Sequence, residues 1–111
     1  MNGVPTVPIQ QVPDPLPAGL HVLDVREEAE WRHGHIEGAT HIPLADLPAR
    51  VSALPEEQTL VVCRIGGRSA RAVAYLCRLG YDAVNLDGGM VDWEAAGRPM
   101  VSETGEAPRV V

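Results

Sequence analysis

The sequence has no lysine and only two cysteines among its 111 residues. Two cysteines, Cys63 and Cys77, are too few for the disulfide framework of a small secreted protein, so we expect a reducing, cytoplasmic setting. The nine basic residues are all arginine, and 15 acidic residues give a net charge of -6. Because nucleic-acid binding draws on clustered positive charge, this balance argues against it. The lack of lysine reflects a compositional bias and indicates no function.

Long apolar runs are also lacking. No stretch approaches the length of a membrane span, and residues 1–5 have neither the basic start nor the apolar run of a signal peptide. We therefore expect a cytoplasmic protein without membrane contact. A chain of this length, with 45% hydrophobic residues, has room for one small domain. Any anion that this acidic protein binds must meet local positive charge.

Proline separates the start of the chain from the rest. Five prolines in the first 17 residues exclude a helix there and permit at most a short edge strand over residues 6–10. We expect residues 1–19 to be a Pro-rich part of the domain and residues 20–100 to form its body. Residues 101–111 are polar without periodicity, which predicts a loosely ordered tail.

Apolar runs alternate with helical patterns along the body of the domain. The patterns predict strands over residues 20–25, 39–42, 59–63 and 83–86, and helices over residues 27–32, 45–54, 69–79 and 90–96. The 59–63 run has no polar alternation, as expected for a central strand covered on both faces. The alternation predicts an α/β fold with a mostly parallel sheet of about five strands and helices on both faces.

Cys63 ends the predicted central strand, at the sheet edge where ligands bind in such folds. The next residues form a tight turn into a helix, and Gly66 and Gly67 permit the backbone to curl there. Several N–H groups can then converge on one point and stabilise a nucleophilic thiolate. Free cysteine is often simply buried, but a core cysteine needs no such loop. Cys77, inside the predicted helix, is expected to pack in the core.

The chain resembles the single-domain rhodaneses, the thiosulfate sulfurtransferase family, from about residue 20 to residue 100. Four motifs in order carry the resemblance: Leu23-Asp24-Val25-Arg26; Gly34-His35-Ile36-Glu37-Gly38-Ala39 followed by Ile42-Pro43; Cys63-Arg64-Ile65-Gly66-Gly67-Arg68-Ser69; and Leu86-Asp87-Gly88-Gly89 with Trp93 and Gly97-Arg98-Pro99. The resemblance implies a small rhodanese-like α/β domain.

The resemblance also implies two-step sulfur transfer. The Cys63 thiolate would take the outer sulfur of a donor such as thiosulfate, and the resulting persulfide would pass it to cyanide, a thiol or a sulfur-relay protein. Cys63 is thus the expected catalytic residue, with no cofactor and no metal. The substrate-binding residues would be those of the loop: Arg64, Ile65, Gly66, Gly67, Arg68 and Ser69. Arg64 and Arg68 would steer an anionic donor, and Ser69 is expected to cap the following helix.

Two alternatives remain open. A persulfide carrier or partner-binding module would have the same loop without significant thiosulfate turnover. Phosphatases and arsenate reductases with this fold have one more residue in the loop, whereas four residues separate Cys63 from Arg68 here. The shorter loop suits a sulfur atom better than a tetrahedral oxyanion, so that alternative is less favoured.

Charged residues outside the loop have a structural interpretation. Asp24 and Arg26 flank the end of a predicted strand and are expected to form an ion pair. His33, His35 and His41 are close in sequence, but no cysteine or carboxylate completes a zinc spacing with them, so no metal site is expected.

Overall fold

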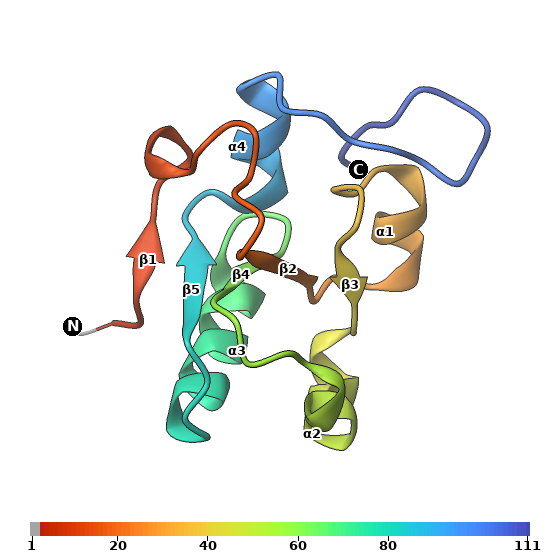
Figure 1. Cartoon of the computed structure of the whole chain (residues 1–111). Coiled ribbons are helices and arrows are strands. Elements are labelled where there is room, and N and C mark those ends of the chain that lie inside the picture. The colour runs from red at the N-terminus through yellow and green to blue at the C-terminus, as the bar shows by residue number, and fades with distance from the viewer. Residues whose placement is uncertain (1–2) are drawn as a thin grey trace.

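The computed structural model describes residues 3–111 and contains one parallel sheet (Figure 1). The first two residues of the expected Pro-rich segment lie outside the described residues. The strands run in the order β1-β5-β4-β2-β3, so β4 is central. Their bounds are Thr6–Val7 (β1), His21–Asp24 (β2), Thr40–His41 (β3), Thr59–Val62 (β4) and Ala83–Leu86 (β5). Every neighbouring pair is parallel, which confirms the predicted sheet.

The helices and strands agree with the predicted alternation except at two places. They are Glu28–His33 (α1), Leu47–Arg50 (α2), Gly67–Arg78 (α3) and Gly89–Ala95 (α4), with short 3-10 turns at Ile9–Gln11 (η1), Leu44–Asp46 (η2) and Val51–Ala53 (η3). The continuous helix predicted over 45–54 is wrong: Pro48 lies in the first turn of α2, where it has no N–H to continue a ladder from η2. The strand predicted over 6–10 ends at Val7, before Pro8 and η1.

Two apolar clusters cover the two faces of the sheet. One includes Leu23 and Val61 and packs under α2 and α3; the other includes Val22, Leu60 and Trp93 and packs under η1 and α4. The division follows from strand geometry, because successive side chains point to opposite faces. All four residues of β4 are buried, as the unbroken apolar run predicts. Within residues 3–111, no helix is long and apolar enough to cross a membrane.

Residues 101–111, expected to be loosely ordered, run back along α1 in the structure (Figure 1). Val101 forms an antiparallel bridge with His35. The Arg109 N–H donates to the His33 carbonyl at 2.9 Å, and the Arg64 Nε donates to the Val111 carbonyl at 3.0 Å. The segment therefore lies between α1 and the loop that follows β4.

Asp24 and Arg26 form a fully buried ion pair at the carboxyl end of β2. Arg26 Nη2 lies 2.8 Å from Asp24 Oδ2, and Nε donates to both carboxylate oxygens. Arg26 Nη2 also donates to the Gly34 carbonyl at 2.7 Å. The pair thereby ties the end of β2 to the segment after α1, which confirms the expected structural role.

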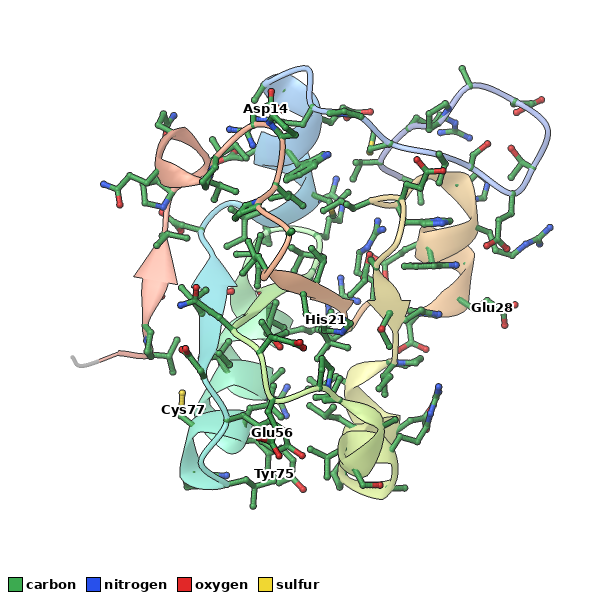
Figure 2. All side chains as sticks on the ribbon, viewed as in Figure 1. Asp14, His21, Glu28, Glu56, Tyr75 and Cys77 are labelled. Atoms are coloured by element: carbon green, nitrogen blue, oxygen red, sulfur yellow. The ribbon has the colours of Figure 1, made fainter. Side chains whose placement is uncertain are left out.

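A pH effect on stability is expected at His21, the first residue of β2 (Figure 2). Burial lowers the pKa of His21, only partly opposed by the nearby Glu57 carboxylate, and its Nε2 has no hydrogen-bond partner among the described residues. In the unfolded chain the His21 pKa is ordinary, so as the pH falls below about 6.5 the imidazole is protonated in the unfolded state before it is protonated in the folded state. The stability that neutral His21 allows is therefore fully present above that pH and is lost as the pH falls through the native pKa.

The variant His21→Gln should lose less stability than the wild type between about pH 7.5 and about pH 5.5. Urea unfolding of both proteins at the two pH values measures this. Parallel losses in the two proteins would contradict it.

Candidate functional site

Cys63 is the first residue after β4, and its side chain is buried with 1% exposure. The Gly66 N–H donates to Cys63 Sγ at 3.1 Å. Gly66 has a φ of 112°, a backbone conformation that residues other than glycine rarely adopt. This turn folds the chain back over the sulfur and leads directly into α3, so the predicted curl of the loop is present.

The first turn of α4 orients the loop. The N–H groups of Met90 and Val91 donate to the carbonyls of Cys63 and Arg64 at 2.8 and 3.0 Å. In a trans peptide the N–H points opposite to the preceding carbonyl, so the N–H groups of Arg64 and Ile65 turn away from α4. Gly89 permits the close approach, because a Cβ there would lie 2.5 Å from the Cys63 carbonyl oxygen. The Gly88-Gly89 pair at the start of α4 therefore sets the peptide orientation around the cysteine.

Opposing effects act on the Cys63 thiol. Burial raises its pKa, whereas hydrogen bonds from the Ser69 hydroxyl and from the N–H groups of Ser69, Gly66 and Ile65 lower it. The hydrogen bonds prevail, and the pKa of Cys63 lies below its ordinary value. A thiol in this position supplies more thiolate at neutral pH than a free cysteine does.

Ser69 is not the helix cap that the sequence predicts. The N-cap is Gly66, and Ser69 is a fully buried residue in the first turn of α3. Its Oγ lies 3.2 Å from Cys63 Sγ and 2.5 Å from Asn85 Oδ1. A hydroxyl has one proton, so it donates to the sulfur when the sulfur is an anion and to the amide oxygen when the sulfur is a thiol. Ser69 is therefore a direct partner of the candidate nucleophile.

Asn85, which the sequence reasoning did not single out, completes this network. It is a buried polar residue of β5, and its Nδ2 donates to the Gly66 carbonyl at 3.4 Å. One amide thus holds both the Ser69 hydroxyl and the glycine turn. The available signal was a single polar residue inside the apolar run 83–86, because a buried amide requires hydrogen-bond partners.

The two loop arginines have protein partners. Arg68 forms two hydrogen bonds with the Glu30 carboxylate, at 2.8 and 2.9 Å, and these raise the pKa of Arg68. Burial opposes that rise, and the negative charge of Cys63 adds to it. Arg64 is exposed and donates a hydrogen bond to the Val111 carbonyl. The next residue, Ile65, is 63% exposed. Both predicted arginines lie on the rim of the cysteine loop.

Cys77 is exposed, so the expected core packing is wrong (Figure 2). Ala72, Val73 and Leu76 form the buried side of α3. Cys77 follows Leu76 by one residue, about 100° around the helix, and turns off that side. Its Sγ lies 3.8 Å from the Ala83 carbonyl oxygen. Among residues 3–111, no N–H group donates to the Cys77 sulfur as the loop N–H groups do to Cys63.

The three neighbouring histidines contact backbone carbonyls. His33, His35 and His41 each place a ring nitrogen 2.8 Å from a carbonyl oxygen. Trp31 stacks between His35 and His41, with ring centroids 3.6 and 4.7 Å away. Across residues 3–111, no group of three or more His, Cys, Asp or Glu side chains is placed to hold a metal ion.

Comparisons with known proteins agree with this geometry. The rhodanese-like domain family matches residues 9–96. A sulfurtransferase from Allochromatium vinosum is 40% identical over 86 residues, covering 76% of this chain and 80% of that protein. The thiosulfate sulfurtransferase GlpE of Stutzerimonas stutzeri is 33% identical over 95 residues, covering 84% of this chain and 87% of that protein.

A solved structure has the same fold. The crystal structure of a rhodanese-related protein from Thermoplasma volcanium aligns with a TM-score of 0.82 and 32% identity, over 87% of this chain and 97% of that chain. The resemblance read from the four sequence motifs and the predicted rhodanese-like fold are both confirmed. Because the family match and the fold likeness span most of the sequence, the chain belongs to the rhodanese-like domain family.

Proposed function

We propose that this protein is a sulfurtransferase that moves sulfane sulfur from a donor such as thiosulfate to a thiophilic acceptor through a persulfide on Cys63. One observation carries the proposal: a buried sulfur at the end of the central strand accepts hydrogen bonds from Gly66 and Ser69 at 3.1 and 3.2 Å. Such donors stabilise an anionic sulfur. The names of the Allochromatium and Stutzerimonas relatives support sulfur transfer as the chemistry.

In the first step the Cys63 thiolate attacks the outer sulfur of thiosulfate. A new S–S bond forms to Cys63, the bond between the two donor sulfurs breaks, and its electron pair leaves with sulfite. The persulfide that remains keeps one negative charge. In the second step cyanide or a thiolate attacks the outer persulfide sulfur, and the electron pair of the breaking bond returns to the Cys63 sulfur. Neither step needs an oxidant, a reductant or a metal ion.

The surroundings of Cys63 fit both anions of this cycle. Loop N–H groups and the Ser69 hydroxyl meet the thiolate, and the glycine turn provides the same kind of donors for the terminal sulfur of a persulfide. Arg64 and Arg68, on the rim, attract the dianionic donor into an otherwise acidic protein. Since Glu30 also binds Arg68, the donor competes with that carboxylate for the guanidinium.

Turnover with thiosulfate and cyanide tests the proposed function. The purified protein should form thiocyanate, and thiosulfate alone should release about one sulfite per protein molecule, because the persulfide forms before the acceptor binds. Absence of both products would overturn thiosulfate turnover. If a cysteine desulfurase still loaded sulfur onto such an inactive protein, its role would be that of a persulfide carrier.

The Ser69 hydroxyl should control the reactivity of Cys63. In Ser69→Ala the thiolate loses one donor, so its pKa rises and the alkylation profile with iodoacetamide moves to higher pH. We expect alkylation at neutral pH to slow by roughly tenfold, the worth of one hydrogen bond to a charged group.

The exposed Ser52 provides a matched control for this prediction. Ser52→Ala should alkylate with the wild-type pH profile. An unchanged profile in Ser69→Ala would show that the hydroxyl does not stabilise the thiolate. Circular dichroism of each variant separates this effect from a loss of folding.

A further inference from the structure

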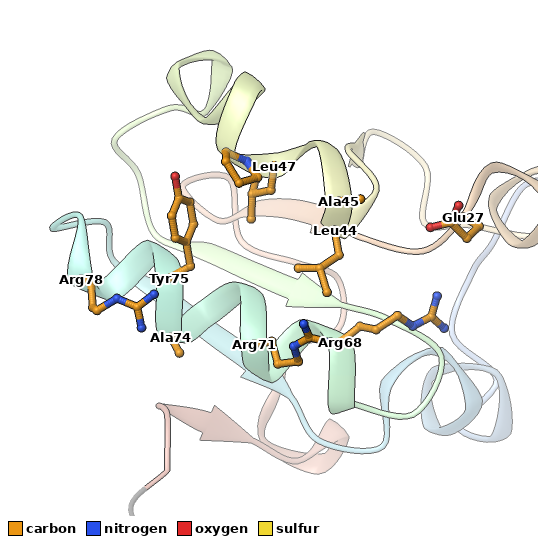
Figure 3. A pocket seen from close by; sticks show the side chains of 10 residues that line it. Glu27, Leu44, Ala45, Leu47, Arg68, Arg71, Ala74, Tyr75 and Arg78 are labelled. Carbon is orange, nitrogen blue, oxygen red and sulfur yellow. The ribbon is translucent and has the colours of Figure 1, made fainter.

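A groove of about 720 Å³ lies between α3 and the segment formed by η2 and α2 (Figure 3). Its floor is apolar and includes Leu44, Leu47 and Tyr75. The Tyr75 side chain points across the groove toward Leu47, and arginines stand along the α3 side. The groove is much larger than thiosulfate or cyanide requires, and it lies beside the cysteine loop, not within it.

Three arginines line one side of the groove. Arg68, Arg71 and Arg78 are three and seven residues apart on α3, which places them along one side of the helix. Arg68 and Arg78 are ten positions apart, which corresponds to about 15 Å of helix. Arg71 and Arg78 are exposed, and neither forms a salt bridge within the part of the chain that the structure describes. Glu27 is the one acidic residue among the described lining residues, so the groove is a cationic strip on an acidic protein.

One end of the groove reaches the candidate site. Arg68 lines the groove, and the next residue, Ser69, contacts Cys63 Sγ. A chain lying along α3 from Arg78 to Arg68 would therefore bring its end to the rim of the cysteine loop. An extended segment of about five residues covers the 15 Å between these arginines.

We propose that this groove docks an extended acidic segment of a protein that presents the thiol accepting sulfur from Cys63, an inference that rests on the proposed function. Carboxylates of the segment pair with Arg71 and Arg78, and its apolar side chains pack on Leu47 and Tyr75. At the loop the acceptor thiolate attacks the outer sulfur of the Cys63 persulfide. A new S–S bond forms on the acceptor, and the electron pair of the broken bond returns to Cys63. A net charge of -6 repels other acidic surfaces, so the groove also selects where such a partner binds.

Peptide binding tests the docking without requiring turnover. The probe is a fluorescent peptide of about six residues, serine followed by alternating glutamate and leucine, compared with a peptide in which glutamine replaces glutamate. We expect the wild type to bind the glutamate peptide roughly tenfold more tightly at low salt, the combined worth of two exposed ion pairs. In Arg71→Glu/Arg78→Glu this preference should disappear. It should be retained in Arg32→Glu/Arg50→Glu, which has the same charge change on exposed residues outside the groove.

Sulfur transfer separates the docking from the chemistry. With cysteine in place of the peptide's serine, the groove variant should raise the KM for the glutamate peptide roughly tenfold and leave thiocyanate formation from cyanide unchanged. Equal affinity of the wild type for the two peptides, or an equal loss in the control variant, would overturn the docking. Preferential binding by a wild type that transfers sulfur neither to the peptide nor to cyanide would overturn the proposed function instead.

Discussion

Replacing Cys63 with serine should abolish sulfur loading. Wild-type protein treated with thiosulfate gains the mass of one sulfur atom, whereas Cys63→Ser gains none, because a serine hydroxyl at neutral pH is not ionised by the donors that stabilise a thiolate. Thiocyanate formation should fall by at least about a thousandfold, as expected when a covalent nucleophile is removed. Intact-mass spectrometry and the cyanide assay measure the two effects.

Cys77 supplies the matched control for this experiment. It is the only other cysteine, and it lies exposed on α3 without the N–H contacts of the loop. The variant Cys77→Ser should load one sulfur and turn over near the wild-type rate. Sulfur retained on Cys63→Ser and lost from Cys77→Ser would move the reaction to the other thiol and refute the mechanism.

The cysteine loop was predictable because its signals are local. An apolar strand, a cysteine, two glycines and a helical pattern follow one another within about 20 residues, and each has a conformational meaning of its own. The central position of β4 followed in the same way from its unbroken apolar run. Local chemistry thus predicts where the sulfur lies and in what kind of turn.

The partners of the loop were not predictable in this way, because they come from distant parts of the chain. Asn85 reaches Ser69 from another strand, and Glu30 reaches Arg68 across 38 positions. The sequence favoured the alternative in which Ser69 caps the helix, since serine is a preferred cap residue. The structure gives that place to Gly66, whose positive φ starts the helix three residues earlier. Pairing across the sheet, not local propensity, therefore decides what surrounds the cysteine.

Cys77 and the segment 45–54 both differ from what hydrophobic spacing alone predicts. Cysteine is a residue type often found in protein cores, but the angular position of Cys77 on α3 turns its side chain away from the sheet. In the segment 45–54 the apolar spacing suits a helix, yet Pro48 interrupts the backbone ladder. Hydrophobic spacing predicts which face is buried only where the backbone can follow a regular helix.

Removing one partner of the buried Asp24–Arg26 ion pair should cause the largest loss of folding stability expected for a single substitution in this chain. In Arg26→Met the Asp24 carboxylate stays fully buried without its cation, which costs about 3–5 kcal/mol. A domain of this size has a free energy of unfolding of about 5–15 kcal/mol, so much of the protein should unfold at modest urea concentrations. The variant also loses the hydrogen bond from Arg26 to the Gly34 carbonyl. Urea unfolding followed by circular dichroism measures the change.

A double variant distinguishes an unpaired charge from lost packing. Asp24→Leu/Arg26→Met removes both charges, so it should be more stable than Arg26→Met alone, because apolar side chains can replace a buried ion pair at little cost. Even the native pair is incompletely satisfied, since Arg26 Nη1 is buried without a partner among the described residues. A double variant no more stable than the single one would assign the loss to packing. Asp24 pairs in register with Val62, the residue before Cys63, so the ion pair lies beside the end of the strand that carries the cysteine. A double variant that folds and still forms thiocyanate would show that the pair supports this sheet edge and takes no part in the chemistry.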